Sequence, residues 1–388
     1  MITITDKSLC SGCHACMSIC PKKCIVMQMD NEGFLYPHGN KTDCIDCGMC
    51  EKVCQSINPI ISGNIGKAYA CINNNMEVRL ASSSGGIFTL IAEKILEEGG
   101  VVFGAGYDEN FNVHHVAVES KEQLSLLRGA KYVQSTIGDA YVQAKDYLDE
   151  GRYVLFTGTP CQIDGLLHYL NRKYEKLYTQ DLVCHGAPSP LVWRRYIQCR
   201  EEEASASMSR IFLRYKKYSW KAYFVQFEFS NNTEYEQIFS KDLFMKGFLA
   251  NLYLRPSCYN CHSKTLKRNS DITLADFWGI NRIYPEFDDD KGTSLVFVNS
   301  EKGSCLFEKI IPELMYKRVD ILAAVKANPS AYKSVAMHPK RKSFFKKIDK
   351  MTIDKLIKKY NRTSIKIKVK LFIKRIIYIL KRVLNKQS

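Results

Sequence analysis

The 388-residue sequence predicts a small cysteine-rich α+β domain, a larger α/β domain with antiparallel additions, and a basic C-terminal helix. Three observations support this prediction. Eight cysteines recur at fixed spacing between Cys10 and Cys54, strand patterns alternate with helix patterns from Ala68 onward, and the net charge of +16 lies in the C-terminal tail. With 46% hydrophobic residues, the chain can bury a sizeable core in two or three domains.

The cysteine-rich segment contains one spacing pattern twice. The pattern is Cys-x-x-Cys-x-x-Cys-x-x-x-Cys, from Cys10 to Cys20 and again from Cys44 to Cys54. In bacterial ferredoxins each such run gives three thiolates to one [4Fe-4S] cluster and the fourth to the other. Structural zinc and disulfides fit less well, because four-cysteine zinc sites usually show two separated pairs. The predicted ligands are Cys10, Cys13, Cys16 and Cys54 for cluster one, and Cys20, Cys44, Cys47 and Cys50 for cluster two.

Between the two runs, residues 25–36 alternate around a turn at 30–33, which predicts a short hairpin. We therefore expect residues 1–60 to form an α+β ferredoxin-like domain that holds two [4Fe-4S] clusters. The N-terminus lacks the basic-then-apolar stretch of a secretory signal. Thiolate clusters also need a reducing compartment, so we expect a cytoplasmic protein.

From residue 66 the pattern changes to strands that alternate with helices, which predicts an α/β sheet. Strands are expected at 69–73, 101–106, 113–118, 152–156 and 177–183, and helices at 87–98 and from 160 to about 170. Antiparallel structure that covers part of the site is expected at 210–215, 223–229 and 234–239. A glycine turn is expected at Gly104 and Gly106, but Glu109 stands where a Rossmann fingerprint has its third glycine.

A serine- and glycine-rich loop, residues 81–86, precedes the helix expected at 87–98. Its free N–H groups and the positive end of the helix dipole suit a phosphate. An ordinary serine cap explains the same residues equally well. The stretch from Thr157 to Cys161 precedes a second expected helix in the same way, because Pro160 suits a first helical turn.

Four further cysteines are candidate ligands. Cys161 is expected at a helix start, which favours the thiolate, and Cys184 follows the strand at 177–183. Cys258 and Cys261 form a separate Cys-x-x-Cys pair with His262 beside it. The spacing alone leaves zinc, a redox dithiol and an iron–sulfur cluster open for this pair.

The tail from Pro339 to Ser388 holds 18 Lys and Arg but only two Asp and Glu, so the rest of the chain is formally neutral. This distribution gives no indication of a nucleic-acid surface on the body. Residues 365–384 place apolar side chains on one helical face and basic ones on the other. We expect peripheral binding to an anionic membrane surface, with docking on the body or a solvated tail as the alternatives. No apolar run is long enough to span a membrane.

Several stretches beyond the ferredoxin part resemble one family, the beta subunit of coenzyme F420 hydrogenases and dehydrogenases. They are 82–86, 131–135, 157–162, 181–186, the Cys258/Cys261 pair and 271–279. The resemblance covers about residues 1–300, and the basic tail is not part of the pattern.

The resemblance implies an iron–sulfur flavoprotein that carries FAD, and it implies a third [4Fe-4S] cluster. The implied ligands of this cluster are Cys161, Cys184, Cys258 and Cys261. The implied flavin contacts are Ser83, Ser84, Gly85, Gly86, Lys131, Thr157, Gly158 and Thr159. The expected architecture is then an α+β ferredoxin-like dicluster domain at 1–60, followed by an α/β flavin-binding domain with antiparallel additions at 66–335, whose parts divide near 150. A basic amphipathic tail at 339–388 completes it.

The function expected from this resemblance is an oxidoreductase that passes electrons between ferredoxin-type clusters and FAD, and between FAD and a substrate that the sequence does not name. The alternative is an electron-transfer subunit that feeds a partner enzyme and has no substrate site of its own. A third class is a redox-sensing or scaffold protein. The expected partners are an electron-donor or acceptor protein and an anionic membrane surface at the inner face of the membrane. No nucleic-acid partner is expected.

Overall fold

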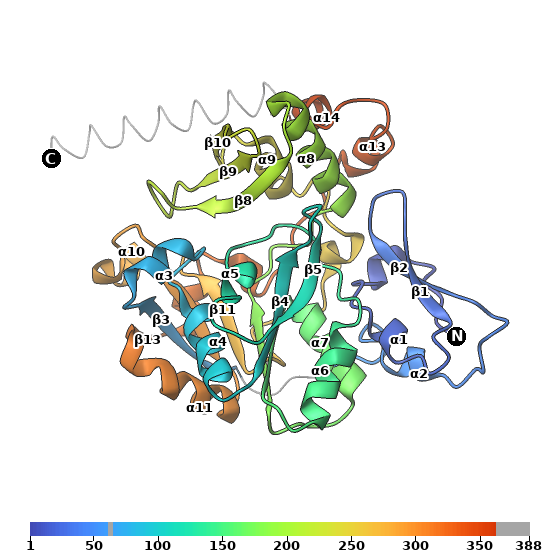
Figure 1. The fold of residues 1–388 in the computed structure, drawn as a ribbon, viewed down its shortest axis with the longest axis horizontal. Helices are drawn as coiled ribbons and strands as arrows, with labels where there is room; N and C mark the ends of the chain where they lie inside the picture. The colour runs from blue at the N-terminus through green and yellow to red at the C-terminus, as the bar shows by residue number, and fades with distance from the viewer. Residues whose placement is uncertain (61–64, 362–388) are drawn as a thin grey trace, which may run out of the picture.

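The computed structural model describes residues 1–60 and 65–361 (Figure 1). The amphipathic helix predicted at 365–384 lies outside the described residues. Among the described residues, no helix has the length and apolar character that crossing a membrane requires.

The cysteine-rich domain consists of one hairpin and very short helices. Strand β1 (Ile25–Met29) pairs antiparallel with β2 (Leu35–Gly39), as the alternating pattern predicts. The helices are η1 (Lys7–Leu9), α1 (Ala15–Ser18) and α2 (Met49–Lys52). Each of α1 and α2 sits inside one cysteine run, so the two runs form corresponding turns beside the hairpin.

The body is built on an eight-stranded sheet of order β13-β3-β12-β11-β7-β6-β4-β5. Its strands are β3 (Lys67–Asn73), β4 (Val101–Tyr107), β5 (Val113–Val118), β6 (Val154–Thr157), β7 (Leu177–Leu182), β11 (Ile272–Asp276), β12 (Ser294–Val298) and β13 (Leu314–Val319). The four central strands β4, β6, β7 and β11 are parallel, and the outer strands join antiparallel. The central strands therefore end at one common edge, called the carboxyl edge below.

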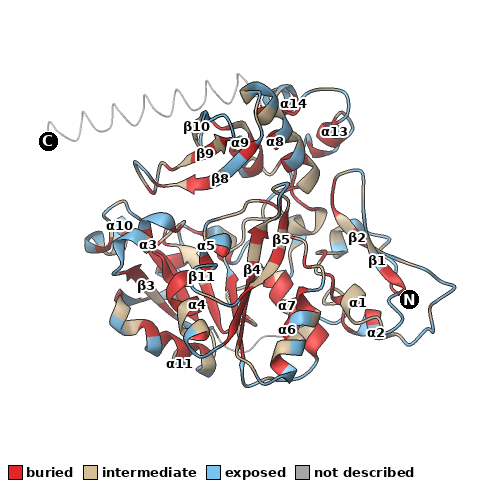
Figure 2. Ribbon diagram, in the orientation of Figure 1, coloured by how far each residue is buried: buried red, intermediate tan, exposed pale blue. Residues whose placement is uncertain are grey.

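Helices cover both faces of this sheet because successive strand residues point to opposite sides. On one face, Val102 and Leu155 pack under α4 (Ile87–Glu97) and α11 (Glu301–Ile310). On the other, Phe103 and Phe156 pack under α6 (Ala140–Asp149) and α7 (Pro160–Leu170). Figure 2 shows the buried strands between these two helix layers. The α/β architecture expected from the alternating pattern is thus present.

A three-stranded antiparallel sheet lies above the large sheet in the view of Figure 1. Its strands are β8 (Met208–Tyr215), β9 (Phe224–Phe229) and β10 (Glu234–Ile238). The helices α8 (Pro190–Ala204) and α9 (Leu243–Leu249) share its core through Trp193 and Phe244. The remaining short elements are α3 (Met76–Ala81), α5 (Leu124–Leu127), η2 (Pro256–Asn260), α10 (Ile280–Ile283), η3 (Pro285–Phe287), η4 (Ile311–Glu313), α12 (Ile321–Val325) and η5 (Pro329–Ala331).

Two local expectations need correction. Strand β4 runs straight through Gly104 and Gly106, so the expected glycine turn is wrong. A Cβ on Gly104 would lie 2.8 Å from the Thr157 hydroxyl, so the glycine makes room for a neighbouring strand. The start of the expected tail also differs: residues 341–360 form α13 (Arg341–Phe345) and α14 (Ile353–Tyr360), which bury Phe344 and Leu356 in the core of the small sheet.

Candidate metal centres and the carboxyl edge of the sheet

The structure gathers Cys10, Cys13, Cys16 and Cys54 around one cavity in the cysteine-rich domain. These are the four residues that the spacing assigns to cluster one. Three come from the first run, whereas Cys54 arrives from the second run because α2 returns the chain to the same side.

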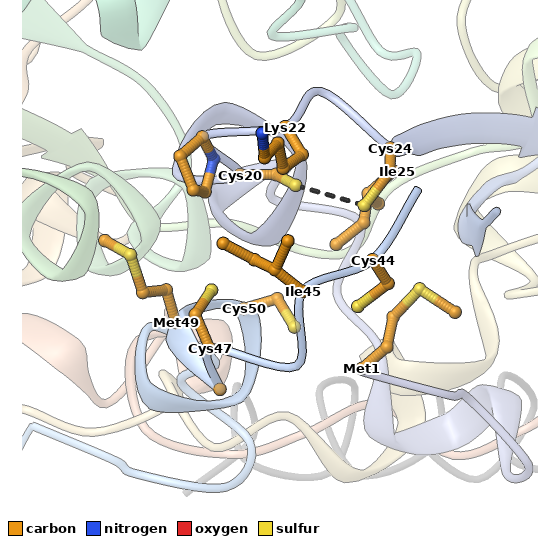
Figure 3. Close-up of a pocket in the computed structure, with 12 residues that line it drawn as sticks. Met1, Cys20, Lys22, Cys24, Ile25, Cys44, Ile45, Cys47, Met49 and Cys50 are labelled. Carbon is orange, nitrogen blue, oxygen red and sulfur yellow. Dashed lines mark hydrogen bonds between the residues drawn. The ribbon is translucent and has the colours of Figure 1, made fainter. Parts of the chain in front are cut away.

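A second cavity is lined by Cys20, Cys44, Cys47 and Cys50, the set assigned to cluster two (Figure 3). Backbone N–H groups of Ile2 and Asp46 donate to the sulfurs of Cys50 and Cys44 at 3.2 and 3.4 Å. Such N–H donors stabilise the negative charge of cluster thiolates.

This second cavity lies at the surface, because Cys47 and Ile45 are exposed. A fifth cysteine, Cys24, also lines it, and its sulfur lies 3.4 Å from that of Cys20. Cys24 falls outside both spacing runs, so no pattern in the sequence predicts its place beside this cavity.

The third candidate centre combines residues from three distant segments. Cys161 lies in the first turn of α7, Cys184 follows β7, and Cys258 and Cys261 lie in and after η2. The Ala187 N–H donates to the Cys258 sulfur at 3.3 Å, and Lys264 donates to the carbonyl of His185 at 3.1 Å. These bonds hold the β7 loop against the η2 segment at the carboxyl edge.

The electrostatics show that these four thiols lie close together. Burial raises the pKa of Cys161, and the neighbouring Cys261, Cys184 and Cys258 raise it further. Burial and the neighbouring Cys184 and Cys261 raise the pKa of Cys258 to about 12. Cys161 lies in the first turn of its helix as expected, but burial raises its pKa instead of lowering it. Four partly buried thiols that oppose one another's ionisation fit a cationic centre, which would relieve that repulsion.

Cluster-one cysteines contact the helix that carries Cys161. A Cβ on Gly165 of α7 would lie 2.8 Å from the Cβ of Cys13 and 3.1 Å from its sulfur. Gln55 donates to the Cys161 carbonyl at 2.7 Å and to the Ser11 hydroxyl at 3.1 Å. Figure 1 shows α1 beside α7 at this junction. Cys13 and Gln55 thus connect the first cysteine set to the helix that carries Cys161 of the third set.

Part of the expected flavin contacts lies around the start of α4. Gly86, at φ 83°, precedes this helix, and the Gly85 N–H donates to the Ser294 hydroxyl at 2.9 Å. Ser83 accepts from the Ala130 N–H at 2.7 Å, and Ser84 donates to the Thr293 carbonyl. The loop therefore packs against the segment that leads to Lys131.

Lys131 has no carboxylate among its partners in the part of the chain that the structure describes. Its ammonium contacts the carbonyls of Leu127, Arg128 and Gly129 at 3.3 to 3.4 Å. Burial lowers its pKa to about 7. A partly buried amine beside a helix start is suited to an anion.

The other expected flavin contacts follow β6. Thr157 donates to the Phe103 carbonyl, the Gly158 N–H donates to the Gln180 carbonyl at 3.1 Å, and Thr159 caps α7 with Gln162. Leu127 packs at Gly104 beside Thr157. The 127–131 segment therefore links the α4 loop to the Thr157 loop.

One polar cluster at this edge was missed by sequence reasoning. Arg214 of β8 pairs with Asp276 at the end of β11 at 2.7 Å, and Trp220 donates to the same carboxylate at 3.2 Å. The rings of Trp220 and Trp278 stack at 4.8 Å. Asp276 and Trp278 belong to a stretch that the sequence singled out, but Arg214 and Trp220 come from the small sheet and the loop after β8, and no local pattern indicates that contact.

The cysteine sets and their cavities define an iron–sulfur protein. Residues 9–57 match the family described as 4Fe-4S dicluster domain. Residues 151–322 match the family described as the C terminus of the coenzyme F420 hydrogenase/dehydrogenase beta subunit. These matches confirm the resemblance for residues 9–57 and 151–322, and they show that residues 151–322 are similar to the C-terminal part of that beta subunit.

A solved chain of the F420-reducing [NiFe] hydrogenase complex from Methanosarcina barkeri, studied with xenon, is 17% identical to this chain. The similarity covers 78% of this chain and 92% of that chain, with a TM-score of 0.46. The search of curated proteins finds no match.

Proposed function

We propose that the protein is an iron–sulfur flavoprotein oxidoreductase that passes electrons between ferredoxin-type [4Fe-4S] clusters and FAD, and between FAD and a substrate. The cysteine sets around the two cavities hold clusters one and two, and Cys161, Cys184, Cys258 and Cys261 hold the third cluster. The main support for this proposal is the junction where Cys13 packs on α7. This junction connects the cysteine-rich domain to the carboxyl edge of the sheet, where ligands of open α/β sheets bind.

The order of the centres supports an electron path through the protein. Cluster two lies at the surface, where a partner protein can reach it, and cluster one lies between it and α7. The third centre lies at the carboxyl edge. A zinc ion at this third site would be redox-inert and would interrupt the path, whereas an iron–sulfur cluster continues it.

Ser83 to Gly86 and Lys131 form the proposed anion-binding part of the FAD site. Lys131 offers a cation without a carboxylate partner among the described residues, next to the loop that starts α4. Thr157 to Thr159 border the same edge. Bound there, FAD would supply the exchange between single electrons and electron pairs, while the protein provides placement and electrostatics.

A second candidate is an electron-transfer subunit without its own substrate site. The matching family is named for a beta subunit, which favours action within a complex. Turnover by the isolated chain with an added acceptor distinguishes the two, because only the first requires a substrate site here.

The basic tail is proposed to bind anionic membrane surfaces peripherally. The described part supports a basic outer surface, since Lys358 and Lys359 of α14 are exposed while its apolar face is buried.

The experiment that tests the function is anaerobic purification followed by iron and flavin analysis, then reoxidation of the reduced protein with candidate acceptors, including coenzyme F420. We expect about 12 irons per chain, from three four-iron clusters, and bound FAD. A protein with full iron that neither contains flavin nor takes up added FAD would contradict the flavoprotein proposal.

A further inference from the structure

Arg255 differs from the other buried arginines in the described part of the chain. Six arginines there are buried, and five of them pair with a carboxylate. Those five are Arg79, Arg200, Arg214, Arg268 and Arg341. Arg255 is only 1% exposed, and none of its guanidinium hydrogen bonds to the described residues reaches a carboxylate. An unpaired buried charge is costly, so a counter-charge is needed.

The guanidinium is directed at the ligands of cluster one. Its Nε donates to the Cys10 carbonyl at 2.7 Å, and its Nη2 contacts the Cys10 sulfur at 3.5 Å. Its Nη1 donates to Gln134 at 3.0 Å, and its central carbon lies 4.3 Å from the Tyr36 ring centre. A Cβ on Gly12 would lie 2.7 Å from Nη1, so this loop leaves room for the guanidinium.

The backbone of Arg255 belongs to the third centre. Its N–H donates to the Ala187 carbonyl at 2.9 Å, and its carbonyl accepts from the N–H of Cys258 at 3.0 Å. Both Ala187 and Cys258 lie in the segments that assemble that centre. One residue therefore joins the first and third cysteine sets.

We propose that Arg255 is the counterion of cluster one and raises the reduction potential of that cluster. The proposal rests on the proposed function, because the cluster with its four thiolates supplies the missing negative charge. A cluster becomes more negative when it gains one electron, so a buried cation beside it favours the reduced form. Arg255 is here a positioning and potential-setting residue that never itself carries the electron.

Cluster two has different surroundings. In the described residues its sulfurs accept from backbone N–H groups, and the carboxylate of Asp46 lies 3.5 Å from the Cys44 sulfur. The side chain of Asp46 and that of Lys22, which also lines this cavity, are both exposed, so solvent screens their opposite charges. The N-terminal ammonium of Met1 also lines this cavity, but it pairs with the carboxylates of Asp46 and Glu51 at 3.7 and 3.5 Å. The buried guanidinium beside cluster one has no carboxylate partner among the described residues. Cluster one should therefore have the higher midpoint potential, so that an electron received at the exposed cluster moves inward.

The test is an anaerobic redox titration, followed by electron paramagnetic resonance, on the reconstituted full chain. Cys47→Ser perturbs the signal of cluster two and so assigns the two ferredoxin clusters. Arg255→Gln should lower the midpoint of cluster one and leave that of cluster two unchanged, whereas Arg255→Lys should retain most of the wild-type value because it keeps the charge. Arg341→Gln is the matched control, since this buried arginine at the same junction pairs with Glu32 at 2.9 Å.

Unchanged midpoints in Arg255→Gln with full iron would overturn the role of Arg255, and so would equal shifts in the Gln and Lys variants. The wild-type titration tests the proposal even if Arg255→Gln does not fold. A midpoint potential that is higher for cluster two than for cluster one would also overturn the proposal. Iron analysis of the same wild-type samples tests the proposed function separately from the role of Arg255, because fewer than about eight irons per chain would refute the assignment of clusters one and two itself.

Discussion

The two cysteine regions of this protein are built in different ways. In the cysteine-rich domain, eight candidate ligands lie between Cys10 and Cys54, and short turns deliver them to two cavities. At the carboxyl edge, Cys161, Cys184 and Cys258 come from separate segments and meet only when β6, β7 and η2 have been placed. The first kind of centre depends on local spacing, and the second depends on the folded sheet.

This difference predicts how each centre responds to loss of ligands. Removing two thiolates from the third set by Cys258→Ser/Cys261→Ser should remove about four irons and leave clusters one and two in place. Cys44→Ser/Cys47→Ser should instead remove the irons of cluster two only. Metal analysis after anaerobic reconstitution measures both losses.

The control for these variants is Cys305→Ser, since Cys305 is an exposed cysteine on α11 and belongs to none of the three sets. It should retain all iron. A wild type that holds about eight irons and stoichiometric zinc would refute the third cluster, because zinc occupies such thiolate sites in structural proteins.

The junction between the two regions can be tested by overpacking. Gly165→Ala places a Cβ 2.8 Å from the Cys13 Cβ and 2.8 Å from the Tyr141 hydroxyl. We expect a loss of about 1–3 kcal/mol in the free energy of unfolding, as for extra methyl groups in packed cores, and a changed cluster-one signal. Denaturant titration and electron paramagnetic resonance measure the two effects.

Gly138→Ala is a suitable control for this substitution. Gly138 has a φ of 55°, and no described atom beyond its chain neighbours lies within 4 Å of the place that an alanine Cβ would take, so the variant carries backbone strain without a clash. It should cost about 1–2 kcal/mol and leave every cluster signal unchanged. A Gly165→Ala protein with wild-type cluster signals would show that cluster one does not depend on α7.

Lys131 tests the anion site at the edge of the sheet. Burial lowers its pKa to about 7, and a bound phosphate would raise it, so FAD binding is coupled to protonation of the amine. FAD affinity should therefore fall as the pH rises above 7, by at most about tenfold per pH unit for one proton. Flavin fluorescence titrations at several pH values measure this dependence.

Lys131→Met should bind FAD more weakly and lose this pH dependence. Lys145→Met serves as the control, because Lys145 lies on the surface of α6 and pairs with Asp149. If Lys131→Met retains the wild-type affinity and pH profile, the amine does not contact the flavin phosphates.

The sequence predicted the parts of the molecule that depend on local pattern. The cysteine spacing assigned the residues around both cavities, and alternation located the hairpin and most strands of the two sheets. It could not indicate that Arg255 reaches Cys10 or that Arg214 reaches Asp276, because these contacts join residues that are far apart in the chain. The prediction of a glycine turn at Gly104 was wrong for the same reason, because this glycine leaves room for the side chain of Thr157 on a neighbouring strand.

The docked position of α14 had a local signal that sequence reasoning did not use. Ile353, Leu356, Ile357 and Tyr360 recur at helical spacing, and all four are buried against the small sheet. The membrane prediction for the segment from Pro339 depended on its net positive charge instead. In α14 the apolar face packs against the small sheet, and the lysines on the opposite face are exposed to solvent.

The smallest expected effect concerns the C-terminal residues. Removing 362–388 deletes nine Lys and Arg and no Asp or Glu, and it leaves the packed helix α14 intact. We expect this truncation to weaken sedimentation with anionic liposomes while the iron content and the cluster potentials stay unchanged. Binding of the full chain should also weaken as salt rises, because the attraction is screened over about 8 Å at physiological ionic strength. Removing 339–388 would be a poorer test, since it also exposes the core that Phe344 and Leu356 cover. Equal sedimentation of the full chain and the 362–388 truncation would show that the basic tail does not bind the membrane surface.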